Sequence, residues 1–182
     1  YNSMKQLHII TPVKDSIEST LRTIDAVLDS EINVPFTYTI YNDFSTPENT
    51  ALLENKAQHL GFQLVNLSDL TQHPSPNYLL VLQRERELCL QEDAALLIVE
   101  SDVTVNPDTL QGLWDGAMER KDCGMAASVT VDEVGKVNYP YLFARRMGKQ
   151  VTATRHHCSF CCTLLTNELL RRVDCGLLDS TK

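Results

Sequence analysis

The sequence predicts an α/β protein with a mainly parallel β-sheet and helices on both of its faces. Apolar segments typical of strands alternate with segments of helical periodicity over the first 120 residues. Residues 94–99 are a run of six apolar residues without polar alternation, which is typical of a strand covered on both faces. Because 182 residues suffice for one core and are few for two, we expect a single domain spanning residues 1–182.

The first strand and helix follow from residue type and spacing. Residues 7–11 form a short apolar strand, which we expect Pro12 to end. Apolar side chains at helical spacing predict a helix over residues 16–30. Asp15 or Ser16 is expected to cap its N-terminus.

The second pair is predicted in the same way. β-Branched and aromatic residues at 36–41 predict a strand, and the polar residues 42–45 predict a turn after it. Thr46 is expected to cap the following helix, with Pro47 at its first position and Gly61 at its end.

The remaining elements complete the alternation and then become shorter. Residues 62–67 predict a third strand, and after a loop rich in Ser, Pro and Asn, residues 78–92 predict a helix that leads into the strand at 94–99. Asn106 and Pro107 are expected to open the next helix. The last third predicts strands at residues 123–131, 150–155 and 158–165, another from residue 137 onward, a turn at 132–136 and a helix at 167–173.

Composition excludes several classes of partner. With 16 basic and 24 acidic side chains the formal net charge is -8, which argues against binding of nucleic acid or an anionic membrane surface. A phosphate ligand would therefore need a metal or a local lysine or arginine. The sequence contains neither a secretion signal nor an apolar stretch long enough for a membrane span. We expect a cytoplasmic protein or one at the cytoplasmic face of a membrane.

The six cysteines are expected to be reduced and mostly buried, since a chain with a full core needs no disulfides. Cys158 and Cys161, preceded by His156 and His157, have a spacing that can hold zinc. A second ligand pair at matching spacing is missing, and the segment continues into apolar residues like a strand. Packed cysteines are therefore favoured over a zinc site.

Polar residues follow three of the predicted strands, at residues 11–15, 42–45 and 100–102. In a parallel sheet these carboxyl ends meet at one edge, which is where open α/β sheets bind ligands. Asp43 can accept hydrogen bonds from a base or ribose, and Ser45 can donate or accept beside it. A single polar cluster at a strand end is more often a solvated turn or a helix cap, so the argument depends on all three converging.

Glu100 and Asp102 are the most informative of these residues. Carboxylates two positions apart at a strand end can both lean toward one hard cation, which can in turn hold two phosphates of a nucleotide. The sequence therefore predicts a metal and nucleotide site at this edge of the sheet.

The order of these motifs resembles that of the family 2 glycosyltransferases, which have the GT-A nucleotide-diphospho-sugar transferase fold. Residues 9–15 stand where the family has a strand, a Pro-x-x-Asn-like turn and a helix, and residues 42–45 look like its Asp-Asp-Gly-Ser motif. Residues 100–102 match its Asp-x-Asp motif, and residues 105–110 resemble the helix entry that follows. Residues 164–179 are similar to its later strand, helix and Gly-x-x-Asp segment.

The resemblance implies a Rossmann-like three-layer αβα sandwich. It also implies transfer of a sugar from a UDP- or GDP-sugar to a carbohydrate or lipid-linked acceptor, with inversion. Asp102 would bind Mn²⁺ or Mg²⁺, with Glu100 nearer the ribose or a water on the metal, so that the metal neutralises the leaving diphosphate. Thr11, Pro12 and Asp43 would bind the nucleoside. The full set implied for the nucleotide-sugar is Thr11, Pro12, Val13, Asp15, Asn42, Asp43, Ser45, Glu100 and Ser101.

An inverting transfer also needs a carboxylate that deprotonates the acceptor hydroxyl. In the family this residue lies after the Gly-x-x-Asp segment, and the sequence ends at Lys182 before such a segment. We therefore expect a domain that is incomplete at its C-terminus, in preference to an acceptor-side role for Asp179. No residue is assigned as the catalytic base.

The family's Ala-Arg-Asn-x-Gly signature before the fourth strand is replaced by residues 83–86. Arg84 or Arg86 can reach a diphosphate from this position. An exposed helix face shared with Glu85 and Glu87 is the favoured interpretation.

Two other functions stay open. A sugar nucleotidyltransferase of related fold usually has a Gly-rich loop after its first strand, and residues 13–16 contain no glycine. A non-catalytic binding or scaffold domain would explain why Asn42, Phe44 and Glu100 depart from the family's motifs. A dehydrogenase is disfavoured because no Gly-x-Gly-x-x-Gly turn follows any predicted strand.

Overall fold

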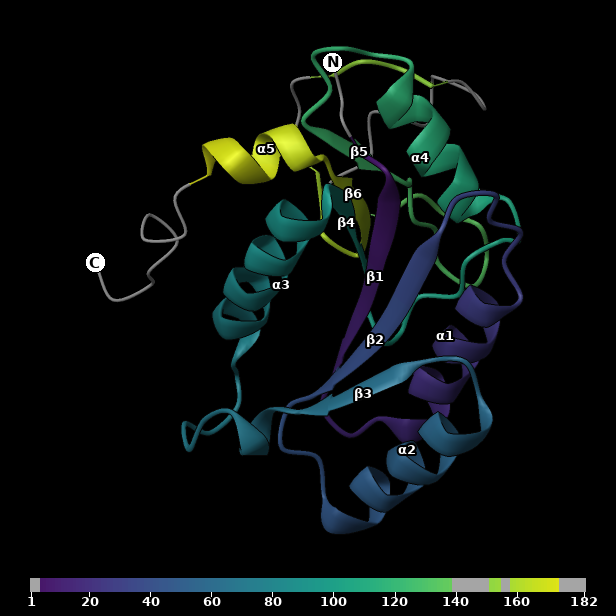
Figure 1. Cartoon of the computed structure of the whole chain (residues 1–182). Helices are drawn as coiled ribbons and strands as arrows, with labels where there is room; N and C mark the ends of the chain where they lie inside the picture. Colours follow the sequence, from purple (N-terminus) through teal and green to yellow (C-terminus); the bar gives the residue numbers. More distant parts are fainter. Residues whose placement is uncertain (1–3, 139–150, 155–157, 174–182) are drawn as a thin grey trace.

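A computed structural model describes residues 4–138, 151–154 and 158–173 of the protein. Strands and helices alternate as far as α4, and two short strands and a short helix follow (Figure 1). In chain order the elements are β1 (Gln6–Val13), α1 (Ile17–Leu28), β2 (Phe36–Asn42), α2 (Pro47–His59), β3 (Gln63–Asn66), the 3-10 helix η1 (Leu67–Asp69), α3 (Tyr78–Glu92), β4 (Ala94–Val99), α4 (Thr109–Met118), β5 (Met125–Ala127), β6 (Cys162–Leu165) and α5 (Asn167–Arg172).

The strands form one sheet in the order β3-β2-β1-β4-β6-β5. β1 pairs in parallel with both β2 and β4, and β2 pairs in parallel with β3. β6 runs antiparallel to β4 and to β5. The prediction of an α/β fold with a mainly parallel sheet is confirmed, and the carboxyl ends of β1, β2, β3 and β4 share one edge.

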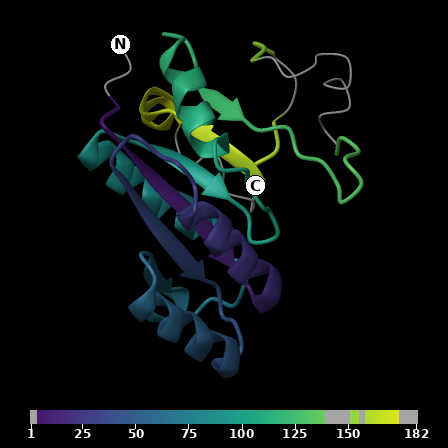
Figure 2. The same ribbon diagram turned by 90° about the vertical axis from the view of Figure 1, so that its right-hand side faces the viewer.

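Helices cover both faces of this sheet and make three layers. Figures 1 and 2 show α1, α2 and α4 on one face, and Figure 1 shows α3 and α5 on the other. On the first face Ile24 and Trp114 belong to a core with alternate residues of β1, β2 and β4. On the second face Val81, Cys89 and Leu170 pack with the intervening strand residues. The predicted αβα sandwich is therefore observed.

The central strands explain the apolar runs of the sequence. All six residues of β4 are buried, as expected for a strand covered on both faces. β1 continues to Val13, so the prediction that Pro12 ends the strand is wrong. Beyond Ile10, β1 pairs with β2 alone. A strand with one free side tolerates proline, because no hydrogen bond to a second neighbour is lost.

The helix ends agree with the sequence in part. The Thr46 hydroxyl accepts a hydrogen bond from the Asn49 N–H at 3.3 Å and so caps α2, with Pro47 at its first position, as predicted. Ser16 is the N-cap residue of α1, one of the two residues predicted, but its side chain makes no cap hydrogen bond. α4 begins at Thr109, later than predicted, because Asn106 and Pro107 lie in the preceding turn.

The last third has fewer strand residues than expected. β5 is limited to Met125–Ala127 at the sheet edge, and Val131 and Val137 form only an isolated bridge across the predicted turn. β6 begins at Cys162, four residues later than predicted. Residues 151–154 have no regular structure. Most of the strand predicted from residue 137 onward lies outside the described residues.

No disulfide involves the cysteines of the described segments. Cys89 and Cys162 are buried, whereas Cys123, Cys158 and Cys161 are half-buried. Cys175 lies outside the described residues, as do His156 and His157, which were considered as zinc ligands. None of the described helices is both long and apolar enough to span a membrane.

Candidate functional site

A cleft of about 390 Å³ lies at the carboxyl ends of β1, β2 and β4. Three of its walls come from the β1–α1 loop, the segment before α3, and the turn after β4. The residues that line it are Pro12, Val13, Lys14, Ser16, Ser19, Asp43, Leu67, Ser75, Pro76, Asn77, Tyr78, Val81, Glu100, Ser101 and Asp102. The three polar clusters predicted to converge therefore each contribute to one cleft.

The turn that carries Glu100 and Asp102 is held on two sides. The Glu100 N–H donates to the Cys161 carbonyl oxygen at 2.9 Å, which extends the pairing of β4 with β6. From α1, the buried Thr23 hydroxyl lies 3.0 Å from the Ser101 carbonyl oxygen and 2.8 Å from that of Val103. Glu100 is half-buried and Asp102 is exposed, so both carboxylates reach the cleft from a fixed backbone.

Asp43 binds the loop on the other side of the cleft. Its Oδ2 atom accepts hydrogen bonds from the Ser75 hydroxyl and the Asn77 N–H, both at 2.8 Å. Its Oδ1 atom accepts one from the Asn77 side-chain amide, also at 2.8 Å. An ionised carboxylate offers about four acceptor positions, so Asp43 retains capacity for one further donor.

Four of the residues predicted for the nucleotide-sugar do not line the cleft. The Thr11 hydroxyl lies 2.8 Å from the Tyr38 hydroxyl on the α1 face of the sheet. Asn42 donates to Thr50 and Asn66, both at 2.9 Å, and so joins α2 and β3. The remaining two, Asp15 and Ser45, connect the first two loops.

Asp15 and Ser45 hold the β1–α1 loop against the start of α2. The Asp15 carboxylate accepts hydrogen bonds from the Thr46 N–H at 2.8 Å and the Asn49 amide at 3.1 Å. These bonds, in that order, hold the pKa of Asp15 below its usual range. The Asp15 N–H in turn donates to the Ser45 hydroxyl at 2.8 Å. Asp15 and Ser45 therefore do not line the cleft, but they hold in place the β1–α1 loop that forms one of its walls.

The loops at this edge adopt backbone conformations that favour glycine. Asp15 and Ser16 have φ of 53° and 46°, and Phe44 has φ of 61°. The positive φ of Phe44 is a conformation that glycine adopts without steric cost. Non-glycine residues in this region store strain, which is common at ligand-binding sites.

Lys14 and residues 75–78 line the cleft but were not predicted from the sequence as site residues. Among the described lining residues Lys14 is the one lysine or arginine, and its ammonium group donates to the Phe44 carbonyl oxygen. Lys14 directly follows β1, so its position at the carboxyl edge of the sheet could have been predicted from the sequence. Nothing in the sequence places residues 75–78 at the cleft. They are held there by hydrogen bonds to Asp43, and Asn77, which makes one of these bonds, lies 34 residues after Asp43 in the sequence.

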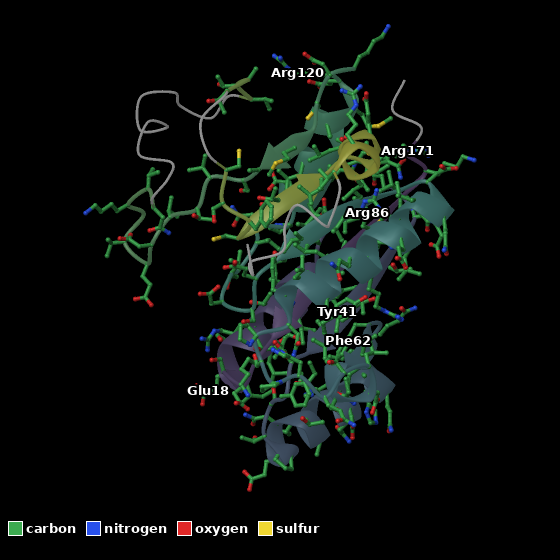
Figure 3. All side chains as sticks on the ribbon, turned by 90° about the vertical axis from the view of Figure 1, so that its left-hand side faces the viewer. Glu18, Tyr41, Phe62, Arg86, Arg120 and Arg171 are labelled. Carbon is green, nitrogen blue, oxygen red and sulfur yellow. The ribbon has the colours of Figure 1, made fainter. Side chains whose placement is uncertain are left out.

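The arginines considered for the diphosphate lie elsewhere. Arg86 donates to the Leu170 carbonyl oxygen at 2.8 Å and so joins α3 to α5. Figure 3 labels Arg86 and Arg171 on these two helices. Neither Arg84 nor Arg86 lines the cleft. The prediction that Glu85 shares an exposed face with Glu87 is wrong for Glu85, which is 2% exposed.

Glu85 belongs to a buried polar cluster between α3 and the sheet. Tyr41, which lies beneath α3 in Figure 3, donates to Glu85. His8 Nδ1 lies 3.3 Å from a carboxylate oxygen of Glu85, and His8 Nε2 lies 2.8 Å from one of Glu92. This cluster ties β1 and β2 to the helix that begins at the cleft.

His8, Glu85 and Cys89 also form a group that could be considered for a metal. Within the described segments they are the one set of three such side chains whose ligand atoms all lie within 4.8 Å of one another. Burial, followed by the charges of Glu85 and Glu92, raises the pKa of the Cys89 thiol and disfavours the thiolate that binds metals. Because hydrogen bonds already satisfy His8 and Glu85, we interpret the group as structural.

The carboxylates of the cleft suit a different kind of cation. Glu100 and Asp102 supply only oxygen ligands, which hard cations such as Mn²⁺ and Mg²⁺ prefer. Two carboxylates are too few for a cage made by protein alone. They fit a metal whose other positions are taken by phosphate oxygens and water.

No protein-family model matches the sequence, and no curated protein matches it. Solved structures do match the fold. A mannosyltransferase, PcManGT from Pyrobaculum calidifontis, in complex with GDP-Man and Mn²⁺, aligns over 91% of this chain with a TM-score of 0.65 and 15% identity. A galactosyltransferase, LgtC, in complex with donor and acceptor sugar analogues, aligns over 95% with a TM-score of 0.52 and 18% identity.

The chain has the GT-A glycosyltransferase fold. It spans 46% of the length of the mannosyltransferase chain and 62% of that of LgtC. At these identities the likeness concerns the fold, so the roles of individual residues depend on the cleft itself.

Proposed function

We propose that this chain is the nucleotide-sugar-binding part of a metal-dependent glycosyltransferase of family 2. The observation that carries the proposal is the convergence of Asp43, Lys14, Glu100 and Asp102 on one cleft at the carboxyl edge of a GT-A sheet. The GDP-Man and Mn²⁺ bound to the similar mannosyltransferase support the choice of ligand class. The order of the sequence motifs supports the choice of family.

The cleft offers distinct environments for the parts of a nucleotide-sugar. Pro12, Val13 and Asp43 lie at the β1 and β2 ends, where Asp43 can accept one hydrogen bond from the base or ribose. Lys14 carries the positive charge that an anionic diphosphate needs, in a chain whose net charge is -8. Glu100 and Asp102 lie further along the edge, at the end of β4.

Asp102 is the proposed ligand of Mn²⁺ or Mg²⁺, with Glu100 beside it. The metal, when bound, supplies positive charge that stabilises the diphosphate as a leaving group. The chain's own part is to fix the two carboxylates: Thr23 and Cys161 hold the backbone on either side of them. A carbohydrate or lipid-linked acceptor and inversion at the sugar carbon belong to the proposal as well. So does a location in the cytoplasm or at the cytoplasmic face of a membrane.

Equilibrium binding tests this function. UDP, GDP and, as a control for any nucleotide, ADP are titrated calorimetrically into the chain with and without Mn²⁺. Binding of UDP or GDP that requires Mn²⁺ supports the proposal. A folded chain that binds none of the three in either condition contradicts it.

A binding or scaffold domain without catalysis is the second candidate. One observation favours it: Asn42, Asp15 and Ser45 use their polar groups within the protein. Metal-dependent nucleotide binding together with slow hydrolysis of a UDP- or GDP-sugar would exclude this candidate. Loss of binding in a folded chain would favour it.

A further inference from the structure

Asp43, Ser75 and Asn77 form a corner of the cleft whose side chains present only hydrogen-bond acceptors. The Asp43 carboxylate accepts from the Ser75 hydroxyl and from two N–H groups of Asn77, all at 2.8 Å. Because the Ser75 proton is given to Asp43, the Ser75 oxygen offers only lone pairs to any other group. All three residues line the cleft.

The orientation of the Asn77 amide is fixed by its neighbours. Its nitrogen donates one hydrogen to Asp43 at 2.8 Å and the other to the His73 carbonyl oxygen at 2.9 Å. Because both partners are acceptors, the amide cannot turn over to present its nitrogen without losing two hydrogen bonds. The side-chain oxygen of Asn77 is therefore the group that is left for a ligand.

The Asn77 oxygen is unpaired and accessible. None of the hydrogen bonds among the described residues involves it. The one side-chain polar atom of the described segments that is both completely buried and unpaired is the Tyr78 hydroxyl, so the Asn77 oxygen keeps accessible surface. Asn77 and Asp43 are 7% and 9% exposed, and both line the cleft. A ligand in the cleft can therefore reach an acceptor on each residue.

Apolar side chains line the cleft close to this corner. Pro76 directly precedes Asn77, and the Val81 N–H donates to the Asn77 carbonyl oxygen in the first turn of α3. Both side chains line the cleft together with Pro12 and Leu67. A nucleobase has apolar ring faces and a polar edge, so it suits a polar corner set among apolar side chains.

Nucleobases differ in the hydrogen-bond donors that they would bring to this corner. Guanine carries two neighbouring donors, its N1–H and its 2-amino group. Uracil carries one N–H between two carbonyl oxygens, whereas adenine and cytosine each carry an amino group beside an acceptor nitrogen. We propose that the cleft selects guanine, whose two donors are accepted by Asp43 and by the Asn77 side-chain oxygen. This inference rests on the function proposed above and narrows its donor to a GDP-sugar.

Uracil fits the same corner poorly. Its single N–H can be accepted by Asp43, but a carbonyl oxygen of the base then meets the Asn77 oxygen. Two acceptors in contact leave each other unpaired, and an unpaired polar group in a cleft closed to water weakens binding. Selection thus depends on the amide of Asn77, whose direction Asp43 and His73 determine.

A comparison of three nucleotides on the wild-type chain tests the inference without any substitution. Dissociation constants are measured with Mn²⁺ for GDP, UDP and inosine diphosphate, which differs from GDP only in lacking the 2-amino group. We expect GDP to bind about ten- to a hundredfold more tightly than UDP, and about five- to tenfold more tightly than inosine diphosphate. Equal affinities for GDP and inosine diphosphate overturn the inference, as does UDP binding as tight as that of GDP.

The Asn77→Ala variant tests the residue itself, with Asn66→Ala as its control. The Asn66 side chain is also hydrogen-bonded, to Asn42 and Glu54, but does not line the cleft. Asn77→Ala should lower the ratio of GDP to UDP affinity by about fivefold or more, whereas Asn66→Ala should leave the ratio unchanged. A purely structural role of Asn77 would weaken both nucleotides by the same factor, and that result overturns the inference. If urea denaturation shows that Asn77→Ala does not fold, the wild-type comparison decides.

The same titrations separate this inference from the proposed function. A wild-type chain that binds UDP with Mn²⁺ as tightly as GDP, or in preference to it, leaves the proposed function standing and overturns the selection of guanine. A folded wild-type chain that binds none of these nucleotides overturns the proposed function, and the inference fails with it.

Discussion

The Thr23 hydroxyl lies 2.8 Å from the Val103 carbonyl oxygen and so ties α1 to the turn that carries Glu100 and Asp102. The same hydroxyl lies 3.0 Å from the Ser101 carbonyl oxygen. A helix on one face of the sheet thus determines where the two acidic side chains stand. The site depends on this side chain although Thr23 does not line the cleft.

Replacement of Thr23 by valine should therefore affect both stability and binding. We expect Thr23→Val to lower the free energy of unfolding by about 1–2 kcal/mol, since two backbone carbonyls lose a buried donor. Mn²⁺-dependent affinity for UDP or GDP should fall as well. Ser30→Ala, which removes a hydroxyl bonded to Ala26 at the far end of α1, serves as the control. Equal effects of the two variants on binding would contradict the account.

Asp43 is expected to hold the loop before α3 in its place. Asp43→Asn should lower the free energy of unfolding by about 2 kcal/mol, because an amide group cannot accept all the hydrogen bonds from Ser75 and Asn77. Asp69→Asn, at an exposed position of η1, should change stability little. Urea denaturation measures both. An Asp43→Asn variant as stable as the wild type would argue against this role.

The buried carboxylate of α3 should matter far more than its exposed neighbour. Glu85→Ala leaves the Tyr41 hydroxyl and His8 without their buried partner, so we expect a loss of about 3 kcal/mol. Glu87→Ala, at an exposed position of the same helix, should stay within about 0.5 kcal/mol of the wild type. Similar losses in thermal or urea unfolding would refute the structural interpretation of this cluster.

His8 should make stability depend on pH. Burial opposes protonation of His8, but hydrogen bonds and charges from Glu85 and Glu92 outweigh it and raise the pKa above the ordinary value of 6.5. The added stability is therefore fully present below pH 6.5 and is lost as the pH rises through the raised pKa of the folded state.

The comparison of wild type with His8→Gln isolates this contribution. The difference in their free energies of unfolding should shrink as the pH is raised above 6.5. Measurements across neutral and mildly alkaline pH in urea provide the test. A difference that stays constant, or grows with pH, would mean that protonated His8 does not stabilise the fold.

Local signals in the sequence predicted most of the fold. The apolar run of β4, the cap and proline of α2, and the bounds of α3 were predicted because each depends on neighbouring residues. The errors arise where tertiary contacts decide. Pro12 is tolerated because β1 extends beyond its pairing with β4, which ends at Ile10. Glu85 is buried because Tyr41 and His8 are its hydrogen-bond partners.

The candidate site shows the same division. Glu100, Ser101 and Asp102 could be assigned to the cleft from the end of a buried strand. The loop of Ser75 to Tyr78 could not, because only the contact with Asp43 brings it there. Likewise, Asn42, Asp15 and Ser45 were predicted to contact the nucleotide-sugar. In the structure their polar groups form hydrogen bonds within the protein that join neighbouring segments.

Calorimetric titration of UDP and GDP into Asp102→Ala, with and without Mn²⁺, is the most direct test of a metal and nucleotide site at the end of β4. Asp108→Ala, which removes an acidic side chain from outside the cleft, is the matched control. We expect Mn²⁺-dependent binding of UDP or GDP to the wild type and to Asp108→Ala, and its loss in Asp102→Ala. Equal binding to all three proteins would contradict a metal and nucleotide site at Glu100 and Asp102.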